Sequence, residues 1–265
     1  MKTFYWEKNP QSRETIVFLH GFPGNHLGLV DLANKFPNQY RLIIPDMPAC
    51  GKTPPLSRPH TLKNYARWLK DFLRELQIEN PIIVGHSFGS RVALVFASHY
   101  QNQAEKLVLL TPVVALYGIM PRIASLKGII AKMLPQYMQK RWLSHPLYQY
   151  VVKMIIFKSA SKKRRDEITN INNEELKSLD VNATIEVFDE FYTSNLLPMA
   201  KAIKIPCLII AGDRVEVDTP ASIKKLGSQS NLFTVAVMQK SGHLLPLESP
   251  AATAKIIKHW LNNTL

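Results

Sequence analysis

The chain has 265 residues, of which 46% are hydrophobic and 20% are charged, and this balance excludes an intrinsically disordered protein. That length is enough for one large α/β domain, or for a core with an insertion, and it can bury a substantial core. The formal net charge is +13, and eleven Lys and Arg lie within residues 113–165, which contain no Asp or Glu.

The cysteines and the N-terminal residues indicate a cellular compartment. Cys50 and Cys207 lie far apart in the sequence, so we expect no disulfide framework and a reducing environment. Residues 1–10 contain no apolar stretch long enough for a signal peptide. No run approaches the ~20 apolar residues of a membrane-spanning helix. We therefore expect a cytoplasmic protein.

From residue 4 to residue 111 the chain alternates strand-like apolar runs with amphipathic helices. The expected elements are, in order, strands at 4–8 and 15–20, a helix at 27–36, a strand at 41–45, a helix at 62–76, a strand at 82–84, the helix directly after it, and a strand at 106–111. Thr61 is a suitable N-cap for the helix at 62–76. This alternation predicts the α/β class, with a mostly parallel sheet and helices on both faces.

The alternation stops at Pro112 and resumes near residue 199. Between these points only helical stretches are predicted, at 119–134, 136–143, 148–157, 168–178 and 183–193. A strand at 205–212, a helix at 220–227, a strand at 232–239 and a helix at 250–261 then complete the chain. The simplest architecture is an α/β core of residues 1–112 and 199–265, with an inserted helical cap of residues 113–198.

The stretch that predicts chemistry follows the strand at 82–84. Residues 85–89 read Gly-His-Ser-Phe-Gly, and apolar residues at helical spacing come next. This is the context of a nucleophile elbow, in which a strained strand-to-helix turn lifts a serine hydroxyl clear of the sheet. A Cβ at Gly85 or Gly89 would clash where the strand and the helix crowd the turn. Ser87 is therefore the candidate nucleophile.

Four motifs at the ends of predicted strands carry a resemblance to a known family. They are His20-Gly21-Phe22-Pro23-Gly24, Asp46-Met47-Pro48-x-x-Gly51-Lys52-Thr53, Gly85-His86-Ser87-Phe88-Gly89 and Gly242-His243. With these motifs in this order, the chain resembles the α/β-hydrolase family over essentially its whole length. The resemblance implies a serine hydrolase of the esterase type, with the helical insertion as the family's cap domain.

The resemblance also implies a role for each site residue. Ser87 would attack an acyl carbon and His243 would accept its proton, since a serine hydroxyl is a poor nucleophile at its own pKa. The backbone N–H groups of Phe22 and Phe88 would form the oxyanion hole.

The acid of the triad stays open between several carboxylates. The family usually has Asp three residues after the strand-ending glycine and about four before a proline, and counting forward from Gly212 gives Val215. Counting back from Pro220 gives Glu216, which is the preferred candidate. Asp213 comes next and Asp218 after it, and a site without an acid is a further alternative.

We expect an enzyme that cleaves a carboxylic ester or a related acyl bond through an acyl-enzyme, without a cofactor or metal. The apolar residues of the cap favour a hydrophobic ester or acyl substrate. The alternatives are acyl transfer or C–C bond hydrolysis on the same triad, or a catalytically weak ligand-binding or membrane-associated protein of this fold. The basic residues of the cap either form its solvated face or contact an anionic membrane. Nucleic-acid binding is not expected, because no recognisable motif accompanies the charge.

Overall fold

The computed structural model of the protein describes residues 1–114, 133–135, 138, 180–215 and 220–264. The helices predicted at 148–157 and 168–178 lie outside the described residues, as do most of those predicted at 119–134 and 136–143. The inserted cap therefore stays a prediction apart from its last helix. Glu216 and Asp218 also lie outside the described residues.

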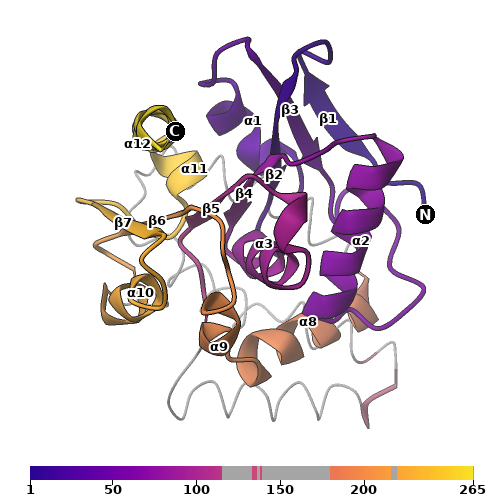
Figure 1. Ribbon diagram of the computed structural model, residues 1–265. Coiled ribbons are helices and arrows are strands. Elements are labelled where there is room, and N and C mark those ends of the chain that lie inside the picture. The colour runs from indigo at the N-terminus through magenta and orange to yellow at the C-terminus, as the bar shows by residue number, and fades with distance from the viewer. Residues whose placement is uncertain (115–132, 136–137, 139–179, 216–219, 265) are drawn as a thin grey trace.

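A seven-stranded sheet forms the centre of the molecule (Figure 1). Its strands are β1 (Tyr5–Lys8), β2 (Glu14–Leu19), β3 (Tyr40–Pro45), β4 (Ile82–His86), β5 (Lys106–Leu110), β6 (Cys207–Gly212) and β7 (Phe233–Met238). Their order across the sheet is β1-β3-β2-β4-β5-β6-β7. All neighbours are parallel except β1, which pairs antiparallel with β3. The predicted α/β class with a mostly parallel sheet is confirmed.

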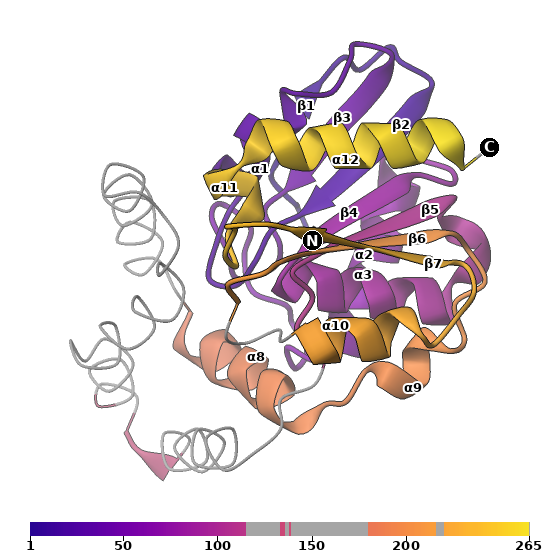
Figure 2. The same cartoon turned by 90° about the vertical axis from the view of Figure 1, so that its left-hand side faces the viewer.

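Helices cover both faces of this sheet (Figures 1 and 2). One face carries α1 (Leu27–Ala33), α11 (Leu245–Glu248) and α12 (Pro250–Asn263), and the other carries α2 (Leu62–Glu75), α3 (Phe88–His99) and α10 (Pro220–Gly227). Two further helices, α8 (Val181–Thr193) and α9 (Leu197–Ala200), pack beyond α3 and join the same core. A single turn of 3-10 helix, Gln101–Gln103, precedes β5.

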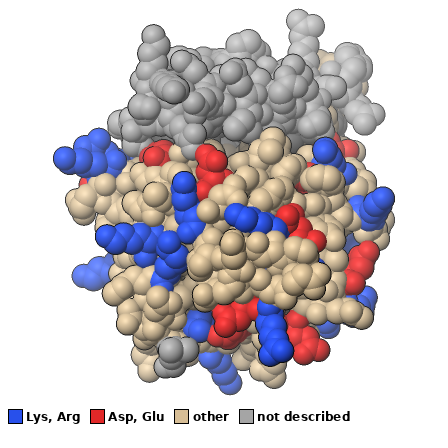
Figure 3. Space-filling view, turned by 90° about the horizontal axis from the view of Figure 1, so that it is seen from above, with Lys and Arg blue, Asp and Glu red and all other residues tan. Residues whose placement is uncertain are grey.

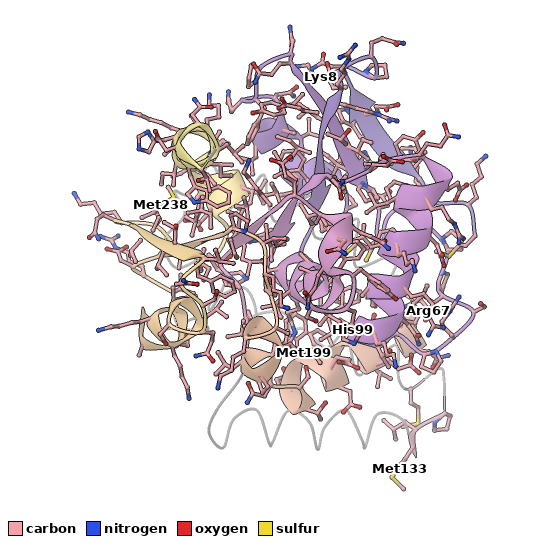
Figure 4. The ribbon with its side chains drawn as sticks, viewed as in Figure 1. Lys8, Arg67, His99, Met133, Met199 and Met238 are labelled. Carbon is pink, nitrogen blue, oxygen red and sulfur yellow. The ribbon has the colours of Figure 1, made fainter. Side chains whose placement is uncertain are left out.

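Alternate residues of each central strand enter two separate hydrophobic cores. Val17 and Ile83 pack with the α2 and α3 side, whereas Ile16 and Val84 pack with the α1 and α12 side. Burial on both faces explains why these strands are continuous apolar runs in the sequence. Met238, at the end of β7, lies on the α12 side of the sheet (Figure 4).

The helices α2 and α8 each begin after a residue whose side chain caps the first turn. α2 begins as predicted after Thr61, whose side chain accepts a hydrogen bond from the backbone N–H of Asn64 at 3.3 Å. α8 begins after Asp180, which accepts from the backbone N–H of Ala183 at 2.8 Å. Cys50 and Cys207 are both buried and form no disulfide, as expected.

Charged side chains of both signs are interspersed over the described surface in Figure 3. Since residues 113–165 contribute eleven of the thirteen net positive charges, the remainder of the chain is close to neutral. Across the described residues, no helix is long and apolar enough to cross a membrane.

Candidate active site

The carboxyl ends of the parallel strands bring the predicted motifs to one edge of the sheet. Ser87 lies between β4 and α3, with φ of 51° and ψ of −111°. A side chain on Gly85 would overlap the backbone of Gly89 and Ser90, and one on Gly89 would overlap the carbonyl of Leu19. Both glycines are needed for the reason that the sequence predicts, namely the close approach of the turn to its neighbours.

Ser87 and His243 are in direct contact. The distance from Ser87 Oγ to His243 Nε2 is 2.9 Å, which is within hydrogen-bond range. Ser87 is 8% exposed, and its backbone N–H donates to the carbonyl of Leu110 at 3.0 Å. The serine hydroxyl is therefore within hydrogen-bond distance of a ring nitrogen that can accept its hydrogen when the other ring nitrogen carries the proton.

The loop that carries His243 is fixed by hydrogen bonds from several elements. The N–H of Gly242 donates to Glu248 Oε2 at 2.9 Å, and the N–H of Arg214 donates to the carbonyl of Ser241 at 3.0 Å. A side chain on Gly212 would overlap the backbone of Ser241, so the loop after β6 and the loop after β7 pack without space between them. These contacts therefore fix the backbone of the loop that carries His243.

Asp213, one of the three candidate acids, is among the residues that hold the loop of His243. Its Oδ1 accepts from the N–H of Ser241 at 3.1 Å. Hydrogen bonds from the backbone of Lys240, and then of Ser241, hold the pKa of the Asp213 carboxyl below its usual value. In the described part of the chain, no hydrogen bond joins Asp213 to His243.

The loop after β2 is held against the loop after β3 by two histidines. His20 Nδ1–H donates to the carbonyl of Gly21 at 2.7 Å, and its Nε2 accepts from the N–H of Met47 at 2.9 Å. Burial lowers the pKa of His20 to about 4, so the ring is neutral, as this pattern requires. His26 Nδ1–H donates to the fully buried Asp46 at 2.7 Å.

Phe22 and Phe88, the two candidate oxyanion-hole residues, meet beside Ser87. Their rings pack edge to face with centroids 5.8 Å apart. Within the described residues, no hydrogen bond uses the backbone N–H of either phenylalanine. Both N–H groups are therefore free to bind an oxygen atom, and the first turn of α3 adds its partial positive charge at Phe88.

An aromatic cluster extends from these two rings to α8. Phe188 packs edge to face on Phe22 at 6.2 Å, and Phe191 lies 5.4 Å from Phe88. The ring of Tyr65 in α2 also packs edge to face with that of Phe88, with centroids 5.1 Å apart. The ring of Phe88 is therefore enclosed by other aromatic rings. Among the described residues, no three His, Cys, Asp or Glu side chains gather in a way that could hold a metal ion.

The fold and this arrangement define a class of protein. Residues 14–250 match the model of the family described as alpha/beta hydrolase fold, and the chain belongs to that family.

Its relatives support a hydrolase. Lipase 3 of Moraxella sp. (strain TA144) is 26% identical over 97% of this chain and 80% of its own length. Lipase 1 of Psychrobacter immobilis is 25% identical over 96% of this chain and 78% of its own length. Among solved structures, a hydrolase from Oleispira antarctica matches the fold with a TM-score of 0.82, at 15% identity, over 98% of this chain and 94% of that one.

Two polar residues contact the backbone of His243, and only one of them, His86, lies in a motif that the sequence singles out. His86 Nε2–H and Thr111 Oγ–H both donate to the carbonyl oxygen of His243. The signal that could have found Thr111 was its place at the end of β5, since polar residues at the carboxyl ends of parallel strands share one edge of the sheet.

Proposed function

We propose that this protein is a serine hydrolase that cleaves a carboxylic ester or a related acyl bond through an acyl-enzyme. The observation that carries the proposal is the 2.9 Å contact between Ser87 Oγ and His243 Nε2 at a strained strand-to-helix turn. A serine hydroxyl paired with an imidazole in this way is the arrangement that activates it for attack.

In the proposed reaction, His243 accepts the Ser87 proton as the hydroxyl attacks the acyl carbon. The tetrahedral intermediate carries its negative charge on the former carbonyl oxygen, and the N–H groups of Phe22 and Phe88 stabilise it. His243 then donates the proton to the leaving alcohol, which departs and leaves an acyl group on Ser87. A water molecule, deprotonated by His243, releases the acid and restores the serine.

Glu216 is the acid that we propose to orient the His243 imidazole. Two considerations support it: the spacing back from Pro220, and the engagement of Asp213 with the backbone of Ser241. Asp213 accepts from the loop backbone and, among the described residues, makes no hydrogen bond to His243. Asp218 is the remaining candidate.

The proposed substrate is a hydrophobic ester. Phe22 follows the loop residue Gly21, which lies next to Ser87, and its ring packs on Phe188 of α8, and burial of apolar substrate groups against such partly exposed rings is favourable. Two relatives bear the name lipase, which also supports an acyl group of apolar character.

Hydrolysis of p-nitrophenyl esters, from acetate to long acyl chains, tests the proposal. We expect turnover by the wild type and its loss in Ser87→Ala, with a chain-length optimum that measures the acyl site. Labelling by a fluorophosphonate should likewise require Ser87, because an unactivated serine reacts poorly. Wild-type activity no higher than that of Ser87→Ala across the series, with no labelling, would overturn the proposal.

The same assay distinguishes the acids. We expect Glu216→Gln to lower kcat about 10⁴-fold, as loss of a triad acid does elsewhere. Asp213→Asn should lower it far less, because an amide oxygen still accepts from Ser241. The reverse order would make Asp213 the triad acid.

A further inference from the structure

The backbone carbonyl of His243 accepts two side-chain hydrogen bonds. His86 Nε2–H donates to it at 3.0 Å, and Thr111 Oγ–H donates to it at 2.9 Å. The two donors come from the ends of adjacent strands, His86 from β4 and Thr111 directly after β5. A carbonyl oxygen has two lone pairs, and here both have a fixed partner.

These contacts connect His243 to the nucleophile in two ways, through its backbone and through its side chain. His86 precedes Ser87 in the chain, its side chain holds the backbone of His243, and the side chain of His243 reaches back to Ser87 at 2.9 Å. The rings of His86 and His243 also lie side by side, with centroids 5.4 Å apart. The position of the base relative to the serine is therefore set through the residue next to the serine.

His86 is suited to this contact because its protonation state is fixed. Burial, and then the charge of a protonated His243, lower the pKa of His86 to about 3. The ring stays neutral at ordinary pH, and the carbonyl of His243 selects the tautomer with its hydrogen on Nε2. A neutral neighbour also adds no repulsion when His243 becomes an imidazolium.

Thr111 reaches the same carbonyl from a strained backbone. It is fully buried and has φ of 44°, in the left-handed region that β-branched residues rarely adopt. Its N–H donates to the carbonyl of Ile210 at 2.7 Å, which holds the residue in place. Strain of this kind persists where the surrounding structure over-determines it, and it concentrates at functional sites.

We propose that His86 and Thr111 are positioning residues that hold the backbone of His243 so that its imidazole meets the hydroxyl of Ser87. This inference rests on the proposed function. Neither residue touches the reacting atoms, so both act through His243. Their removal is expected to lower kcat and leave KM unchanged, since the substrate contacts are not altered.

Paired substitutions test each donor. Thr111→Val removes the hydroxyl at nearly constant volume, and Thr111→Ser keeps it. His86→Phe removes the donor, whereas the side-chain amide of His86→Gln reaches about as far as Nε2. We expect each donor-free variant to lose about tenfold in kcat, the worth of one hydrogen bond, with recovery in Thr111→Ser and His86→Gln.

Thr253→Val is the matched control. Thr253 is also fully buried and donates to a backbone carbonyl, that of Ser249, at 2.9 Å, but it lies in α12. Its loss should lower the free energy of unfolding and leave kcat unchanged. A kcat within twofold of wild type in both Thr111→Val and His86→Phe would overturn the proposal, as would equal losses in Thr111→Val and Thr111→Ser.

A measurement that needs no substrate separates this inference from the proposed function. Ring ¹⁵N resonances of His243, assigned with a His243→Gln variant, should move in Thr111→Val and stay in place in Thr111→Ser. If the wild type neither hydrolyses esters nor reacts with a fluorophosphonate, the proposed function fails, and these spectra still decide whether the two donors hold the ring. Identical spectra for Thr111→Val and wild type would overturn the positioning role.

Discussion

Gly89 lies where α3 passes close to the backbone at the end of β2. A side chain there would overlap the carbonyl groups of Leu19 and His20, which belong to rigid backbone. We expect Gly89→Ala to lower the free energy of unfolding by about 3 kcal/mol, because one of the two backbones has to move. Urea denaturation measures the change.

Gly28 offers the comparison for this substitution. It lies in α1, and a Cβ added there would meet no other atom, so Gly28→Ala should raise stability by about 0.5–1 kcal/mol through the helix propensity of alanine. Equal effects of the two substitutions would show that crowding at Gly89 does not constrain the turn.

Residues of the site differ in how visible they are in the sequence. Ser87 could be predicted because its strand, its two glycines and its helix are contiguous. Its proximity to His243 followed from the rule that parallel strands end at one edge. The ends of β4 and β5 placed His86 and Thr111 at the same edge as His243, but nothing in the sequence showed that both would donate to the His243 carbonyl. The triad acid stays ambiguous because the loop after Gly212 departs from the usual spacing.

At the scale of elements, α8 is bound to the core by polar contacts as well as by its aromatic residues. Glu186 accepts from the N–H of His60 at 2.6 Å, and the carboxylate of Glu190 accepts from the backbone of Leu62. Both partners lie at the start of α2, where the helix dipole favours negative charge. The two glutamates are one helical turn apart, so a single face of α8 docks there.

Arg91 of α3 completes this attachment from inside the core. It is fully buried, and its guanidinium donates to the carbonyls of Val113 and Glu190 and to the hydroxyl of Ser194. It also lies over the ring of Phe191, 5.1 Å from its centroid. One side chain thus binds both the segment that leaves β5 and the end of α8.

We expect Arg91→Met to lower the free energy of unfolding by about 3–5 kcal/mol, since it leaves several buried acceptors without their donor. Arg67→Met on the exposed side of α2, labelled in Figure 4, is the control and should change stability by less than about 0.5 kcal/mol. Chemical denaturation of both variants provides the test, and similar midpoints would contradict the anchoring role of Arg91.

Elements were easier to predict than their neighbours in space. The periodicity of 183–193 predicted α8 to within two residues, but gave no sign that its glutamates dock on α2. The strands at 4–8 and 15–20 were both found, yet β3 lies between them in the sheet. Strand pairing depends on which surfaces fit together after collapse, and a short strand at the sheet edge has little sequence pattern to specify its partner.

At the scale of the whole molecule, two buried neutral histidines make stability depend on pH. The pKa of His20 is lowered to about 4 and that of His86 to about 3, from an ordinary value of 6.5, mainly by burial. Between these values and 6.5 the unfolded chain binds protons that the folded chain does not. The contribution of these two histidines to the free energy of unfolding is therefore fully present above pH 6.5, and it is lost as the pH decreases below that value.

We expect each histidine to contribute a loss of about 1.4 kcal/mol per pH unit between pH 6 and pH 4.5. Urea denaturation of the wild type and of His86→Gln across this range measures how the free energy of unfolding changes with pH. This change per pH unit should be smaller in the variant by the contribution of one proton, about 1.4 kcal/mol. Equal slopes would mean that His86 is accessible to protons in the folded state.

The segment between β5 and α9 starts and ends at neighbouring points of the molecule, and this has a practical consequence for protein engineering. The N–H of Leu196 donates to the carbonyl of Val114 at 2.9 Å, so the two residues that flank 115–195 meet at one point, while α8 inside that range packs in the core. The pairing of β5 with β6 does not depend on the length of chain between those ends. A segment with adjacent ends costs little extra closure entropy when it is lengthened. Chimeras that exchange residues 115–179 between relatives, and keep α8 with its contacts to Arg91 and to the start of α2, should therefore retain the sheet. They would reveal how much of the substrate preference depends on the exchanged residues.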